Sequence, residues 1–133
     1  MVTSAYAINA YRKSRAEVTT NPLELVIMLY EGAIESLGKA VMAIDIQNIQ
    51  MKLKQMDKAL AIIEELSNAL NFEVGGEIAL NLSDLYYYMM RELLLANIHN
   101  DKEKIEQVIS LLKGLREAWV EIKKDKVPTS QPQ

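Results

Sequence analysis

The sequence of 133 residues predicts an all-α protein, an antiparallel up-down-up-down four-helix bundle on which an N-terminal segment packs as a cap. Apolar residues recur at steps of three and four in four stretches, which is the spacing of one helix face. Short breaks separate the stretches, and short connections make consecutive helices antiparallel. A chain of this length can bury one core without disulfides or metals. We therefore expect a lid segment at 1–20, a bundle at 21–126 and a disordered tail at 127–133.

The first helix is expected at residues 22–44. Asn21 can cap it, Pro22 suits the first helical position, and Glu24 can return a hydrogen bond to the cap. The residues expected to face the core are Val26, Tyr30, Ala33, Leu37, Ala40 and Ile44. A second set flanks them at intervals of seven and is expected to form one wall of a partner-binding groove: Ile27, Ile34 and Val41.

The second helix is expected at residues 48–71, again with apolar residues at alternating steps of four and three. The predicted core face consists of Ile49, Leu53, Met56, Leu60, Ile63, Ser67 and Leu70. The opposite face, expected to be solvated, holds Lys52, Lys54, Lys58, Glu64 and Glu65. The pattern breaks between Asn71 and Gly76, where Gly75 and Gly76 offer the conformational freedom of a tight turn.

The third helix, expected at residues 76–99, carries more apolar surface than one helix face accounts for. Its predicted core face is Ile78, Leu82, Leu85, Tyr86, Met89, Leu93 and Ala96. An ordinary amphipathic helix has one apolar stripe and a polar back. Here Leu80, Tyr87 and Leu94 step by seven on a different face, with Met90 beside them. We expect this second stripe to contact a partner.

The fourth helix is expected at residues 101–125, with Asn100 and Glu103 repeating the Asn-x-x-Glu pattern of a cap. Its predicted core face is Ile105, Val108, Leu112, Leu115, Trp119 and Ile122. The residues after it, 127–133, contain two prolines and no periodicity, which is typical of a disordered tail.

The bulk composition and the scarcity of reactive side chains exclude most other classes of protein. A net charge of −3 with interspersed signs argues against a nucleic-acid module, and there is no cysteine for a disulfide or thiolate. Met1 to Val18 lacks the continuous apolar core of a signal peptide, and the longest apolar run is too short to span a bilayer. We therefore expect a cytoplasmic protein without membrane insertion. A di-iron site in a helical bundle needs Glu-x-x-His pairs, but the residue three positions before His99, the one histidine, is Ala96. We expect no catalytic residue, no metal site and no cofactor.

The N-terminal segment brings apolar bulk to a stretch too short to form its own core. Tyr6, Ile8 and Tyr11 are followed by the polar run Arg12 to Arg15. We therefore expect these three residues to dock on the bundle as a detachable lid.

Several blocks of the sequence resemble the flagellar secretion chaperones of the FliS family. The blocks, in family order, are Asn9 to Tyr11, Asn21 to Leu25 with Met28 to Ile34, Gly75 to Ala79, Leu85-Tyr86 with Tyr88-Met89, Ala96 to Ile98 and Leu115 to Trp119. The resemblance covers roughly residues 9 to 122. It implies a small cytosolic bundle that binds the disordered C-terminal region of flagellin, prevents its premature polymerisation and keeps it competent for flagellar type III secretion. It leaves open further partners, such as an export-gate component or an anti-sigma factor.

Two hypotheses of other classes compete with an export chaperone. A helical homodimeric interaction or scaffold protein would bury the second stripe of the third helix permanently against a copy of itself. A small helical enzyme would need an acid, base or ligand constellation, which the sequence does not offer. A chaperone would instead remain a monomer and gain affinity for flagellin.

Overall fold

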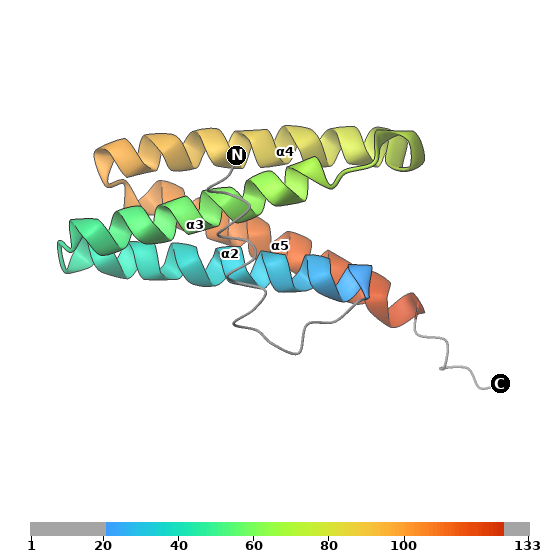
Figure 1. The fold of residues 1–133 in the computed structure, drawn as a ribbon, viewed down its shortest axis with the longest axis horizontal. Helices are drawn as coiled ribbons and strands as arrows, with labels where there is room; N and C mark the ends of the chain where they lie inside the picture. Colours follow the sequence, from blue (N-terminus) through green and yellow to red (C-terminus); the bar gives the residue numbers. More distant parts are fainter. Residues whose placement is uncertain (1–20, 127–133) are drawn as a thin grey trace.

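The computed structural model describes residues 21–126, and within this range it consists of four helices that pack against one another. Their bounds are α2 Pro22–Asp45, α3 Ile49–Asn68, α4 Phe72–His99 and α5 Lys102–Lys126. Consecutive helices run in opposite directions (Figure 1), and α5 returns to pack against α2, which closes a ring of four. The predicted all-α four-helix bundle is confirmed. The predicted lid at 1–20 and tail at 127–133 lie outside the described residues.

Asparagine side chains begin three of the helices. The Oδ1 atom of Asn21 accepts hydrogen bonds from the backbone N–H groups of Leu23 and Glu24, at 2.9 and 3.3 Å. In the same way Asn48 accepts from the backbone N–H of Met51, and Asn71 accepts from that of Val74, both at 3.0 Å. These oxygens satisfy N–H groups that have no partner within the helix.

The fourth helix begins differently from the prediction. Asn100 ends α4 in the left-handed conformation with φ 53°, which asparagine tolerates better than most residues. Asp101 is the residue that caps α5, because its Oδ1 atom accepts from the backbone N–H of Lys104 at 3.3 Å. The expectation that Asn100 starts the last helix is therefore wrong by one residue.

The start of α4 also differs from the prediction. The chain turns between α3 and α4 at Ala69 to Asn71, so α4 begins at Phe72 and Gly76 lies inside it as a kink. Gly76 has φ 52° and ψ −126°, a conformation that is open to glycine and costly for other residues. Beyond this kink, Ile78 is 71% exposed, so its assignment to the core face is wrong.

The core lies along the middle of the bundle and receives residues from all four helices. Its largest fully buried side chains are Tyr30, Leu37, Met56, Ile62, Ile63, Tyr86, Met89, Leu93, Ile105, Val108 and Leu112. On α2, α4 and α5 these residues belong to the predicted core faces. Trp119, expected as a core anchor, packs against this cluster but stays half-buried.

The buried face of α3 is rotated relative to the prediction. Ile49 is 65% exposed and Leu53 is also exposed, whereas Ala59, Ile62 and Leu66 are buried. Alanines are buried on both α2 and α3, so the two backbones can approach closely, and these two helices share the most extensive contact in the bundle. The prediction followed the large apolar residues and gave the alanines no weight.

Two charged residues, one of which was expected at the surface, are largely buried. Lys52 is buried, and its ammonium group donates to the backbone oxygen of Asn97 at 2.9 Å and to Oδ1 of Asn100 at 2.6 Å. Glu92 is buried on α4, where its Oε1 atom pairs with Nζ of Lys104 at 3.0 Å. The expectation that Lys52 is solvated is wrong, because its ammonium group finds acceptors at the end of α4.

Candidate partner-binding surface

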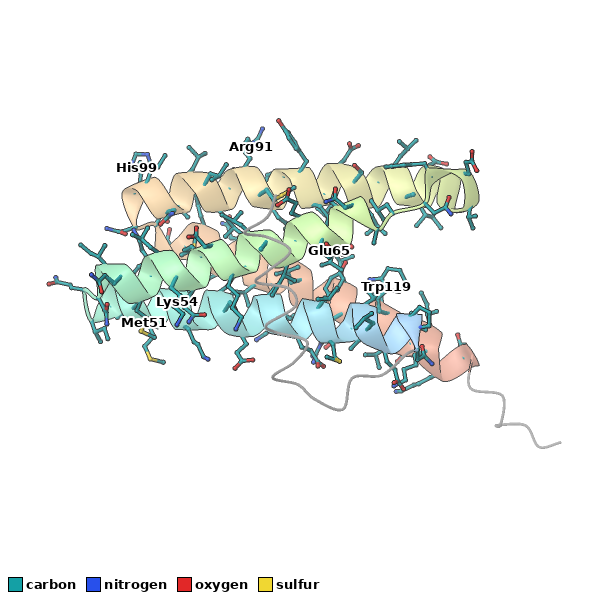
Figure 2. The ribbon with its side chains drawn as sticks, in the orientation of Figure 1. Met51, Lys54, Glu65, Arg91, His99 and Trp119 are labelled. Carbon is teal, nitrogen blue, oxygen red and sulfur yellow. The ribbon has the colours of Figure 1, made fainter. Side chains whose placement is uncertain are left out.

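The second stripe of α4 faces away from the core. Leu80 is 57% exposed, Tyr87 67% and Leu94 54%, while Met90 beside them is half-buried. Figure 2 shows the side chain of Arg91, which lies between Tyr87 and Leu94 on this face, pointing away from the other helices. We call Leu80, Tyr87, Met90 and Leu94 the α4 stripe.

The α4 stripe has apolar neighbours that the sequence reasoning did not assign to it. Ile98 is exposed one turn after Leu94, and Leu95 and Tyr88 are partly exposed at its edges. The step of four from Leu94 to Ile98 is a signal that could have extended the stripe. Single exposed apolar side chains are ordinary, but a run of them along one helix marks an interaction surface.

The three α2 residues expected to form another wall lie elsewhere in the ring. Ile27, Ile34 and Val41 are half-buried, and Ile34 and Val41 pack against the core cluster. Because α2 packs mainly on α3 and α5, it lies diagonally across the bundle from α4. The structure therefore does not bring these residues into one continuous face with the α4 stripe. The predicted lid residues Tyr6, Ile8 and Tyr11 lie outside the described residues.

An apolar pocket of about 270 Å³ opens at the end of the bundle where α2 begins. It forms beside the Gly76 kink, between the end of α3, the start of α4 and the last part of α5. Its lining is Val26, Leu66, Ala69, Leu70, Asn71, Val74, Gly75, Ile78, Ala79, Leu82, Tyr86 and Trp119. Figure 2 shows Trp119 at this end of the molecule. We call this the Trp119 pocket; sequence reasoning missed it because the kink that opens it was taken for a turn.

The polar groups of the bundle serve its packing. The hydroxyl groups of Tyr30 and Tyr86 lie 2.5 Å apart inside the core, and burial raises the pKa of both phenols. The hydrogen bond to Glu92 raises the pKa of the Lys104 ammonium. Within residues 21–126 no three His, Asp or Glu side chains gather as metal ligands would. His99 is exposed at the end of α4, where Figure 2 shows it directed outward.

No helix of the described range is both long enough and apolar enough to cross a bilayer. The described residues form a small helical bundle, with an exposed apolar stripe on one helix and an apolar pocket at one end. The chain belongs to the FliS family, because the family described as Flagellar protein FliS matches residues 4–126.

Curated relatives of the chain carry the same family name. It is 40% identical over 116 residues to the flagellar secretion chaperone FliS of Campylobacter jejuni, covering 87% of this chain and 90% of the relative. It is 40% identical over 123 residues to FliS of Salmonella typhimurium, with 90% and 91% covered. FliS of Bacillus subtilis is 34% identical over 110 residues, with 83% and 80% covered. These names support a role in flagellar export for this chain as well.

Proposed function

We propose that this protein is a cytosolic export chaperone that binds the disordered C-terminal region of flagellin. Binding would keep flagellin from polymerising before export and hold it competent for the flagellar type III apparatus, without catalysis. The observation that carries the proposal is the α4 stripe, whose leucines and tyrosine are solvated in a chain that belongs to the FliS family.

The physical chemistry of the stripe suits a partner that folds on binding. Leucine, methionine and tyrosine spaced along one helix present anchors to an amphipathic segment. Tyr87 can be solvated through its hydroxyl when free and can bury its ring when bound. Methionine adapts to irregular shapes, so Met90 at the stripe edge suits a segment without a rigid structure of its own.

The double variant Tyr87→Ala with Leu94→Ala tests the surface. Both side chains are more than half exposed, so the fold should survive, while the loss of two anchors should weaken flagellin binding at least about a hundredfold. Circular dichroism checks the fold, and titration against the flagellin of the same genome measures the affinity. The matched control is Lys113→Ala with Glu117→Ala, an exposed pair on α5. Wild-type affinity in the folded Tyr87 and Leu94 variant would move the site to another helix.

Co-purification defines the bound region of the partner. Flagellin should be retained when co-expressed whole and lost when its last few dozen residues are deleted. Retention of both forms would contradict a C-terminal site.

The homodimer alternative makes a different prediction, because it buries the α4 stripe permanently. Sedimentation showing a stable dimer that persists with flagellin present would favour that alternative.

We further propose that the segment with Tyr6, Ile8 and Tyr11 covers part of the apolar surface in the free protein. The Trp119 pocket supports the idea, because Val26 on its wall is close in sequence to Asn21, where the described chain begins. Deleting residues 1–16 should strengthen flagellin binding or provoke self-association, measured by titration and by sedimentation. A deletion that changes neither would show that the segment is not a lid.

A further inference from the structure

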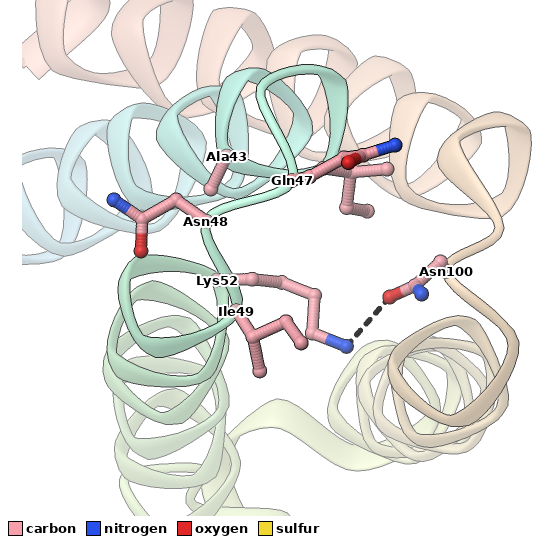
Figure 3. Close-up of a pocket in the computed structure, with 7 residues that line it drawn as sticks. Ala43, Gln47, Asn48, Ile49, Lys52 and Asn100 are labelled. Carbon is pink, nitrogen blue, oxygen red and sulfur yellow. Dashed lines mark hydrogen bonds between the residues drawn. The ribbon is translucent and has the colours of Figure 1, made fainter.

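A second pocket, of about 340 Å³, opens at the other end of the bundle, where the α2–α3 connection lies beside the α4–α5 connection. Its lining is Ala43, Ile44, Gln47, Asn48, Ile49, Lys52 and Asn100. We call it the Lys52 pocket. Figure 3 shows the ammonium end of Lys52 and the amide of Asn100 facing one another across it. Neither the α4 stripe nor the Trp119 pocket includes these residues.

Lys52 places a buried positive charge in this pocket, and within residues 21–126 its ammonium group has no carboxylate partner. Its ammonium group has three protons, and the two acceptors that residues 21–126 provide are uncharged: O of Asn97 and Oδ1 of Asn100. Asp45 and Asp101, the acidic residues next to the two connections, are engaged elsewhere. Asp45 pairs with Lys102 at 2.5 Å, and Asp101 caps α5. A buried charge is costly unless an opposite charge joins it.

Three side-chain amides, those of Gln47, Asn48 and Asn100, complete the polar lining, and each carries an NH₂ donor. The Oδ1 atoms of Asn48 and Asn100 already accept hydrogen bonds, from the backbone N–H of Met51 and from Lys52. The amide of Asn100 therefore retains its NH₂ group for a ligand beside Lys52, whereas Figure 3 shows the amide of Asn48 directed away from Lys52. The apolar part of the lining includes Ile44 and Ile49, and Ile46 is exposed beside the pocket. A cation, amide donors and isoleucines together fit a carboxylate attached to an apolar group.

We propose that the Lys52 pocket binds the α-carboxylate at the C-terminus of the exported partner, with the partner's last side chain against Ile44 and Ile49. The inference rests on the proposed function, because a bound C-terminal region ends in a carboxylate. A C-terminal residue carries its carboxylate and its side chain on one carbon, and the peptide chain leaves it in one direction only. With an internal Asp or Glu in the pocket, the peptide chain would have to leave in two directions. Capture of a chain terminus is a recurring mode of peptide recognition.

The first experiment needs no variant. Two peptides of the last few dozen residues of the flagellin from the same genome are titrated, one with a free carboxylate and one with a terminal carboxamide. We expect the free acid to bind about tenfold more tightly, the ratio that a charge-assisted hydrogen bond supports. Equal affinity of the two peptides overturns the proposal while leaving the proposed function intact. Failure of both peptides to bind overturns the proposed function, and this inference with it.

The second experiment locates the carboxylate with paired variants. Lys52→Met keeps the aliphatic stem and should abolish the preference for the free acid, whereas Lys54→Met, an exposed neighbour with the same charge change, should keep it. A preference that survives in Lys52→Met places the carboxylate elsewhere and overturns the proposal.

A further pair of variants covers the case in which Lys52→Met does not fold. Ile49→Asp and Ile49→Asn have the same shape at an exposed first position of α3, where either is tolerated. The negative charge of Ile49→Asp should weaken binding of the free-acid peptide several-fold relative to Ile49→Asn and leave binding of the carboxamide peptide unchanged. If Ile49→Asp weakens both peptides equally, the pocket binds an acidic side chain instead of the terminus, and the proposal is wrong.

Discussion

At the scale of single residues, Tyr30 and Tyr86 show how the core accommodates polar atoms. Their hydroxyl groups are 2.5 Å apart and their rings pack at 6.4 Å with a tilt of 58°. Each hydroxyl satisfies the other, so neither leaves an unpaired polar atom in the interior. The contact joins α2 to α4 across the bundle, although these two helices have little other contact.

The buried tyrosine pair predicts a loss of stability at alkaline pH. The pKa of both phenols is raised above the ordinary 10.0 by burial. Their contribution is therefore fully present below pH about 10 and is lost as pH rises, because the unfolded chain releases protons that the folded chain retains. Urea unfolding between pH about 8 and about 11 should show this decrease. The double variant Tyr30→Phe with Tyr86→Phe should show a smaller decrease, and an unchanged slope would contradict the assignment.

At the scale of elements, Gly76 decides the shape of α4. An alanine at this position favours a regular helix but cannot adopt φ 52° and ψ −126° without strain. Gly76→Ala should cost about 1–3 kcal/mol or straighten the helix. The control is Gly114→Ala on α5, where an added Cβ meets no atom within 4 Å and should be neutral or stabilising by up to about 1 kcal/mol. Chemical denaturation compares the two, and equal stabilities would contradict a required kink.

The sequence predicted those features of the helices that depend on neighbouring residues, and it failed for features that depend on contacts with another helix. Asn21 and the steps of three and four predicted four helices, because caps and periodicity act within one helix. The face of α3 could not be predicted in the same way, because its burial depends on how closely α2 approaches. Lys52 was assigned to solvent for the same reason: its partners lie at the end of α4, far away in sequence. The α4 stripe was predicted because one helix cannot bury two faces in a single bundle.

At the scale of the whole molecule, the ring of helices is uneven. The α2–α3 contact is the most extensive, and α4 has the least extensive contacts with its two neighbours. This unevenness explains how α4 can keep a solvated apolar stripe while the bundle remains closed.

Because all four helices share one core, truncating a side chain at its centre should lower stability more than truncating one at its margin. Leu112 is fully buried, so Leu112→Ala should lower the free energy of unfolding by about 2–5 kcal/mol. Leu60, predicted as a core residue, is only half-buried, so Leu60→Ala should cost less than Leu112→Ala. Denaturant unfolding followed by circular dichroism measures both. A larger loss for Leu60→Ala would mean that the face of α3 is placed incorrectly.

The packing of α5 against α2 has a consequence for folding during synthesis. The ring joins the first and the last of the four helices, so it cannot close until the ribosome has released α5. The α2–α3 hairpin has only local contacts and can form early, whereas α4 emerges before its second neighbour exists. For that interval the side of α4 that packs on α5 is exposed in addition to the α4 stripe. A nascent chain stalled between α4 and α5 should therefore be the form of this protein most sensitive to proteases.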